Sequence, residues 1–140
     1  MIVDSLMRRE VLVVPETTNV MEAARQMKRR GVGSVVVTRG GEAIGILTER
    51  DVAFRVVAEG RDARSTLVSE VMSQPLATIE PAASVEDAAE KMKALRIKRL
   101  VVALDGEVRG IVTATDVAYA EPSLTRALVE GWVRQRWSDD

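Results

Sequence analysis

Two short stretches of the sequence share a pattern of glycine, threonine and aspartate at fixed spacing. Residues 45–51 and residues 110–116 both read as glycine, two apolar residues, threonine, two variable residues and aspartate. Each lies where a strand-like apolar run gives way to helical spacing, so the threonine is placed to open a helix. Such a threonine can cap the helix and offer its hydroxyl to a phosphate. The unpaired N–H groups expected at the helix start, together with the helix dipole, also attract the phosphate. An aspartate one turn later can accept hydrogen bonds from both hydroxyls of a ribose.

The same residues also have a structural explanation. Thr48 and Thr113 are common N-caps, and Asp51 and Asp116 are common first-turn acids. Two occurrences at equivalent positions favour binding, and the sequence offers neither aspartate an obvious partner for a buried ion pair. The glycines permit close approach of a ligand or a neighbouring backbone. Arg50 has a guanidinium that suits a phosphate, unless it pairs with a neighbouring carboxylate in solvent.

The composition argues against an enzyme. The chain contains neither histidine nor cysteine, which removes the commonest general base, thiol catalysis and the usual transition-metal ligands. We therefore expect no catalytic residues, no metal site and no required cofactor. The net charge of −1, with both signs mixed along the chain, gives no basic stripe for nucleic acid. We find no signal peptide and no apolar run of membrane-span length, and we expect a soluble cytoplasmic protein.

An internal repeat organises the chain. Shifted by 65 residues, the sequence matches itself without a gap from Leu6 to Ala53, with about a third of the pairs identical. Each copy predicts a strand, a helix, a hairpin of two strands and a second helix. Asn19 and Ser84 are placed to cap the first helices, and Gly31 to end one of them. The hairpin turns are expected at residues 40–41 and 105–106.

This pattern predicts an α/β (α+β) fold of two β-α-β-β-α repeats, related by a pseudo-twofold axis and packed as one module. We place the first repeat at residues 1–60, a polar linker at 61–70, the second repeat at 71–122, and a C-terminal helix and tail at 123–140. That helix is expected from about Leu124 to Trp137. Its two tryptophans, with the apolar helix faces, suggest a homodimer, unless both cover the core of their own chain.

The combined motifs resemble a tandem pair of CBS domains, the cystathionine-β-synthase-type pair called a Bateman module. The resemblance covers about Leu6 to Ala120. It is carried by Met7 and Met72, the Ala-Ala-x-x-Met helices, residues 31–37 and 97–102, and the two Gly-x-x-Thr-x-x-Asp patterns. It implies two clefts between the copies, adenosine-type ligands such as AMP, ADP, ATP or S-adenosylmethionine, and association into flat dimers.

The resemblance also implies roles for particular residues. In that family the threonine and aspartate of the pattern contact phosphate and ribose. Adenine lies between aliphatic side chains near the first strand, and the residues opening the middle strand often face the phosphates. The ligand-binding candidates are therefore Val14, Ser34, Thr48, Arg50, Asp51, Ile79, Lys98, Arg99, Thr113, Thr115 and Asp116. The two copies differ, because Arg50 corresponds to Thr115, and Lys98 and Arg99 are equally consistent with a solvated helix end.

We expect a non-catalytic regulatory or sensor module that binds an adenine nucleotide, AMP or ATP before S-adenosylmethionine, and signals to another protein. The alternatives are an S-adenosylmethionine sensor, a protein-interaction module with empty clefts and, against the composition, an enzyme acting on a nucleotide. The sequence does not choose between one occupied cleft and two.

Overall fold

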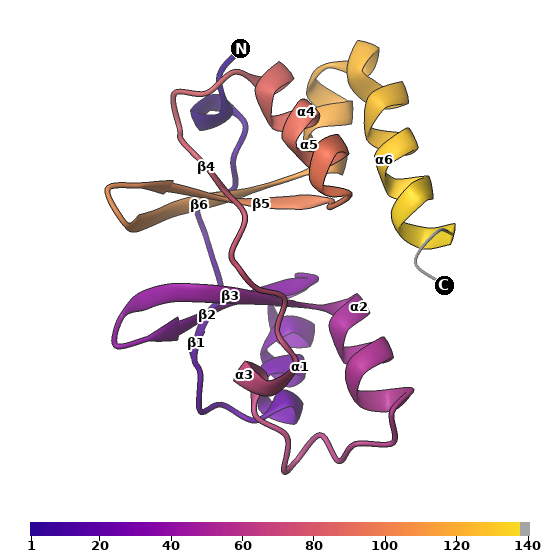
Figure 1. The fold of residues 1–140 in the computed structure, drawn as a ribbon. Coiled ribbons are helices and arrows are strands. Elements are labelled where there is room, and N and C mark those ends of the chain that lie inside the picture. The colour runs from indigo at the N-terminus through magenta and orange to yellow at the C-terminus, as the bar shows by residue number, and fades with distance from the viewer. Residues whose placement is uncertain (138–140) are drawn as a thin grey trace. The chain divides into compact units, whose positions relative to one another are not determined.

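The computed structural model describes residues 1–137, and describes side chains as far as residue 131. It divides the chain into two compact units. We call residues Val11–Leu76 the first unit, and Met1–Glu10 together with the chain from Ala77 onward the second unit. Each unit contains one three-stranded sheet with helices packed against it (Figure 1).

The first unit follows the predicted order of elements. Its strands are β1 (Val13–Pro15), β2 (Ser34–Arg39) and β3 (Glu42–Thr48), with β2 in the centre, parallel to β1 and antiparallel to β3. Helix α1 (Val20–Arg30) connects β1 to β2. After β3 the chain forms α2 (Glu49–Asp51), a π-helical segment (Val52–Val57) and the short helix α3 (Val68–Val71).

The second unit repeats this arrangement. Its strands are β4 (Thr78–Ile79), β5 (Arg99–Leu104) and β6 (Glu107–Thr113), paired in the same parallel and antiparallel senses. Its helices are α4 (Val85–Leu95), α5 (Ala114–Ala120) and α6 (Thr125–Trp137). One 3-10 turn lies near the N-terminus at Val3–Ser5, and another, Pro122–Leu124, lies between α5 and α6. Helix α6 lies along α4 and α5 (Figure 1). The side chains of Trp132 and Trp137, on which part of the dimer expectation depends, lie outside the described residues.

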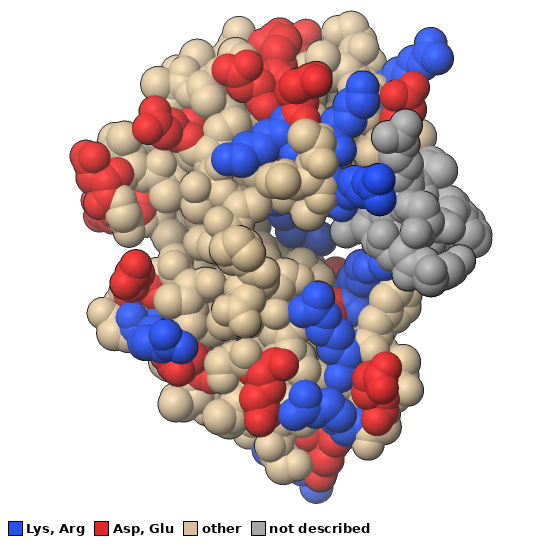
Figure 2. Space-filling model, in the orientation of Figure 1, with Lys and Arg blue, Asp and Glu red and all other residues tan. Residues whose placement is uncertain are grey.

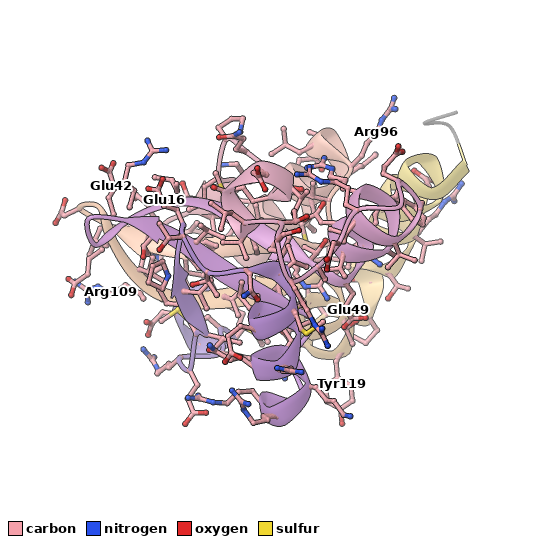
Figure 3. All side chains as sticks on the ribbon, turned by 90° about the horizontal axis from the view of Figure 1, so that it is seen from below. Glu16, Glu42, Glu49, Arg96, Arg109 and Tyr119 are labelled. Carbon is pink, nitrogen blue, oxygen red and sulfur yellow. The ribbon has the colours of Figure 1, made fainter. Side chains whose placement is uncertain are left out.

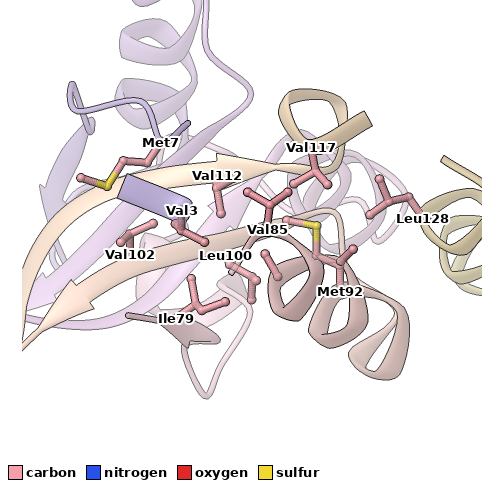
Figure 4. Close-up of a cluster of buried hydrophobic side chains, with 12 residues drawn as sticks. Val3, Met7, Ile79, Val85, Met92, Leu100, Val102, Val112, Val117 and Leu128 are labelled. Carbon is pink, nitrogen blue, oxygen red and sulfur yellow. The ribbon is translucent and has the colours of Figure 1, made fainter. Parts of the chain in front are cut away.

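Each unit has an aliphatic core under its sheet. In the first unit it is built on Val14, Val35 and Leu47. In the second unit the strand residues Ile79, Leu100 and Val112 occupy the equivalent positions of the repeat. They pack against side chains of the helices (Figure 4). Burial of these side chains drives folding because it removes apolar surface from water, at roughly 25 cal/mol per Å².

The local signals behave as predicted. Asn19 and Ser84 accept hydrogen bonds from the amides three residues later, at 2.8 and 2.9 Å. Helix α1 ends at Gly31 with φ of 64°, and α4 ends at its repeat counterpart, Arg96, with φ of 57°. Both hairpin turns have positive φ at their two central residues, as a tight right-twisted hairpin requires.

Three boundaries differ from the prediction. Apolar runs predict the first strands of the repeats at residues 11–14 and 76–79, whereas β1 begins at Val13 and β4 at Thr78, two residues later in each case. The polar stretch 61–70 contains the first turn of α3, with the Leu67 amide donating to Glu70 Oε2 at 2.8 Å. Helix α6 begins at Thr125, because the proline-led turn before it has 3-10 geometry.

The segment at the start of each repeat adds an edge contact to a sheet. Arg8 and Ile111 exchange two backbone hydrogen bonds of 2.9 Å in the second unit. Ser73 and Ile46 exchange bonds of 2.8 and 3.1 Å in the first unit. Residues Met1–Glu10 therefore belong to the same compact unit as the strands and helices of the second repeat, although in sequence they lie at the start of the first.

The glycine that opens each motif makes this approach possible. A Cβ built on Gly110 would lie 2.6 Å from the Arg8 carbonyl oxygen and 2.8 Å from Met7 Sδ. A Cβ on Gly45 would lie 2.6 Å from Met72 Sδ and 3.0 Å from the Ser73 carbonyl oxygen. Of the two possibilities raised by the sequence, close approach of a neighbouring backbone is the one observed.

We expect Gly110→Ala to be more destabilising than Gly45→Ala. Its Cβ meets a hydrogen-bonded backbone oxygen, which cannot move without breaking the edge contact, whereas the nearest atom at Gly45 belongs to a flexible methionine. The overpacking should cost about 1–3 kcal/mol of unfolding free energy for Gly110→Ala. Chemical denaturation of the two variants and the wild type measures this difference. Equal stabilities of the two variants would contradict the proposed steric order.

Candidate functional site

The predicted motif forms a reciprocal cap in the first unit. At the end of β3 the Thr48 amide donates to Asp51 Oδ2 at 2.9 Å, and the Asp51 amide donates to Thr48 Oγ1 at 3.2 Å. The Asp51 side chain is 7% exposed. A hydroxyl that accepts one bond can still donate its own hydrogen, so Thr48 retains a donor for a ligand oxygen.

The second unit reproduces this geometry. The Thr113 amide donates to Asp116 Oδ2 and the Asp116 amide donates to Thr113 Oγ1, both at 3.1 Å. The Asp116 side chain is 11% exposed. Both motif aspartates are thus held in one orientation, with one carboxylate oxygen engaged by the backbone of the strand end.

Strand register brings the start of the middle strand to the motif. Ser34 pairs with Thr48 across β2 and β3, and Arg99 pairs with Thr113 across β5 and β6. Ser34 is buried, with 9% exposure. Within each unit the structure therefore places the predicted strand-opening residue beside the predicted threonine.

The helix starts offer fewer donors than the sequence suggested. The Glu49 amide donates to the Gly33 carbonyl at 3.1 Å, and the Ala114 amide donates to the Lys98 carbonyl at 2.7 Å. The amide two positions later is taken by the threonine cap at each site. The expectation of unpaired N–H groups is therefore wrong for the first and third helical positions, because the cap and the neighbouring strand entry use them.

Both motif aspartates have side-chain partners, although the sequence offers no obvious partner for a buried ion pair. Asp51 accepts from Ser73 Oγ at 2.9 Å and has Arg55 Nε at 3.8 Å. Asp116 pairs with Arg8, whose Nη2 lies 3.1 Å from Oδ1. These partners were missed because Arg8 and Ser73 lie at the start of the two repeats, 108 and 22 residues from the aspartates that they contact. The gapless alignment places them at equivalent positions after Met7 and Met72, but it does not show which sheet edge either segment joins.

The predicted cations lie at the margins of the motifs. The Arg50 guanidinium is stacked over the Phe54 ring, 4.7 Å from its centroid. Lys98 and Thr115 line a hollow of about 360 Å³ in the second unit, together with residues of α5 and α6. The corresponding hollow of the first unit, about 430 Å³, is lined by Ala24, Met27, Lys28, Gly31, Val32, Gly33, Glu49 and Val52. Glu49, which opens α2, is exposed and is labelled in Figure 3.

The predicted adenine contacts lie in the cores of their own units. Val14 is 1% exposed and Ile79 is 9% exposed. The exposed residues of strand β1 are Val13, at 45%, and Pro15. A ligand beside this strand would reach the side chain of Val13 more readily than that of Val14.

Charges of both signs and the described side chains give no sign of a metal site or a membrane span. Lysine and arginine are interspersed with aspartate and glutamate on the face in Figure 2. Among the described residues, no group of three potential metal-ligating side chains is present. No helix in the described part of the chain is long and apolar enough to cross a membrane.

Comparison with known proteins identifies the family. The family model for the CBS domain matches residues 3–58 and 68–123. The chain is 39% identical over 121 residues to the CBS domain-containing protein YhcV of Bacillus subtilis, covering 86% of each chain. It is 37% identical over 130 residues to an uncharacterized protein, MK0525, of Methanopyrus kandleri, covering 91% of this chain and 66% of that one.

A solved structure agrees with the fold. A conserved CBS domain protein of unknown function from Thermoplasma acidophilum is 27% identical, with a TM-score of 0.84, and the match covers 93% of this chain and 75% of that one. The two matches to the family model correspond to the two copies of the repeat, and the solved structure has a similar fold. The chain belongs to the CBS-domain family and carries a tandem pair of these domains, a module that is typically regulatory and ligand-binding.

Proposed function

We propose that the chain is a non-catalytic regulatory module that binds an adenine nucleotide, AMP, ADP or ATP, at its two Gly-x-x-Thr-x-x-Asp motifs. The observation that carries the proposal is the fixed carboxylate of Asp51 and Asp116, oriented identically by the preceding threonine in both repeats. An oriented carboxylate can accept two ribose hydroxyls without further ordering, which favours affinity. No resident cofactor or metal is part of the proposal.

The surroundings of each motif support a phosphate group next to the ribose. Thr48 and Thr113 each retain a hydroxyl hydrogen for a phosphate oxygen. Arg50 lies beside Asp51 in sequence, and Lys98 lies in the hollow that borders Thr115. Cations near a site favour phosphate over the positively charged sulfonium of S-adenosylmethionine.

Asp51→Ala and Asp116→Ala should each weaken AMP binding at one site. Loss of a charged acceptor costs about 1.5–3 kcal/mol, which is roughly ten- to a hundredfold in affinity. Titration calorimetry with AMP measures the change. Asp87→Ala is the matched control, because Asp87 occupies the same position of helix α4 after its own cap, Ser84. Unchanged AMP binding in the Asp51→Ala/Asp116→Ala double variant would show that the assignment is wrong.

A competition titration should rank AMP and ATP above adenosine and S-adenosylmethionine. We expect about tenfold tighter binding of AMP than of adenosine, the size of one charge-assisted contact, and a smaller difference at higher salt. Arg50→Ala should reduce AMP affinity and leave adenosine affinity unchanged. A preference for S-adenosylmethionine would instead support an S-adenosylmethionine sensor. No binding of any of the four compounds would support a protein-interaction module.

We also propose a homodimer, with the helical surfaces as the contact. Large apolar side chains are exposed on the segments that follow the motifs, Phe54 and Val57 in the first unit and Tyr119 in the second, with exposures of 55, 72 and 91% (Tyr119 is labelled in Figure 3). Phe54 and Tyr119 occupy equivalent repeat positions. Exposed aromatic residues of this kind are typical anchors of protein interfaces.

Light scattering at micromolar concentration should give twice the chain mass. Phe54→Glu or Tyr119→Glu should weaken association about tenfold or more, since a charge replaces an interface anchor. Val13→Glu, on strand β1, serves as a control of similar exposure. A monomer mass for the wild-type protein would contradict the dimer.

A further inference from the structure

The two motif aspartates receive different donors from equivalent positions of the repeat. Arg8 and Ser73 are 65 residues apart, and each follows a methionine. Arg8 contacts Asp116 in the second unit, and Ser73 contacts Asp51 in the first. The two proposed nucleotide sites therefore differ in the group that already occupies the carboxylate.

In the first unit, the contact with Ser73 leaves acceptor capacity on Asp51. The serine hydroxyl lies 2.9 Å from Oδ1 and 3.2 Å from Oδ2, but its one hydrogen serves one oxygen at a time. The Thr48 amide takes one further position. Since a carboxylate has about four acceptor positions, roughly two remain for ribose hydroxyls.

The nearby Arg55 does not change this count. Its Nε lies 3.8 Å from Asp51 Oδ1, beyond hydrogen-bond distance. Its Nη1 donates to the carbonyl oxygens of Val71 and Met72, at 3.1 and 2.9 Å. Arg55 therefore contributes positive charge beside Asp51 while its Nη1 serves the backbone.

In the second unit, Arg8 takes positions that a ribose would need. Its Nη2 and Nε lie 3.1 and 3.3 Å from Asp116 Oδ1, and the Thr113 amide lies 3.1 Å from Oδ2. About one acceptor position of four remains. The contact is charge-assisted, so a neutral ribose hydroxyl that replaces it makes a weaker bond.

We propose that Arg8 competes with the ribose at the second motif, so that the chain has one ready nucleotide site at Asp51 and a weaker one at Asp116. This inference rests on the proposed function, because it requires each aspartate to accept ribose hydroxyls. The Arg8 side chain is 65% exposed and can turn into solvent when a ribose displaces it. Arg8 thus sets the order in which the two sites fill.

Arg8→Ser tests the inference by giving the second motif the donor of the first. In calorimetric titration with AMP, we expect the second site to tighten about two- to fivefold, the range for a solvent-exposed charged pair. The backbone bonds of Arg8 with Ile111 do not involve its side chain, so the edge contact is retained. Arg9→Ser is the matched control, because Arg9 pairs with Asp4 at 3.3 Å instead.

Two further variants isolate the sites. In an Asp51→Ala background, Arg8→Ser should tighten the remaining AMP site by the same factor. If that background does not fold, the single Arg8→Ser variant still reports the change as a second binding step within the titrated range. Ser73→Arg should weaken the first site about two- to fivefold, and Ser65→Arg, at an exposed position, is its charge-matched control.

The possible failures are distinguishable. If the wild-type chain binds AMP at Asp51 but Arg8→Ser and Arg9→Ser give the same second-site affinity, the inference is overturned and the proposed function stands. Equal AMP affinities at the two wild-type sites would have the same meaning. If neither the wild-type chain nor Arg8→Ser binds AMP, both the inference and the proposed function are overturned.

Discussion

The close approach of two backbones at the motif glycines is the constraint on which each unit depends. At Gly110 the carbonyl oxygen of Arg8 occupies the space of a Cβ, and at Gly45 the segment of Met72 and Ser73 does so. Because each approaching segment exchanges two backbone hydrogen bonds with the hairpin strand, it is fixed in register. A side chain at either glycine would displace that segment. The contact at the motif glycine thus both fixes the segment in the fold of its unit and places that segment beside the motif.

This constraint determines what each aspartate meets. Once the segment is fixed beside the strand, the side chain at Arg8 or Ser73 points to the carboxylate that the threonine cap holds at the next helix start. The cap fixes one oxygen of the carboxylate from the strand side, and the segment supplies the second partner. An exchange of one residue in the segment therefore changes the electrostatics of the motif without changing its geometry.

The sequence predicts much of this architecture because its local signals are strong. The caps at Asn19 and Ser84, the hairpin turns and the order of elements along the chain all follow from spacing over a few residues. The partners of the aspartates could not be read this way, because Arg8 is 108 residues from Asp116, and spacing along the chain does not show which edge a segment joins. The amides lost to the cap and the strand entry were missed for a related reason. The sequence of a helix start predicts unpaired N–H groups, but whether residues distant in sequence accept hydrogen bonds from them depends on the tertiary structure.

The repeat explains why the two motifs diverged where they did. Glycine, threonine and aspartate are the same in both copies, and in the structure these residues make the close approach and the cap. The two copies differ at positions that make neither the close approach nor the cap with their side chains. Arg50 in the first copy corresponds to Thr115 in the second, and Arg8 corresponds to Ser73. A change at such positions leaves the aspartate oriented while altering the charge and hydrogen-bonding capacity around it. Two sites of one geometry can therefore acquire different affinities without any change in the fold that carries them.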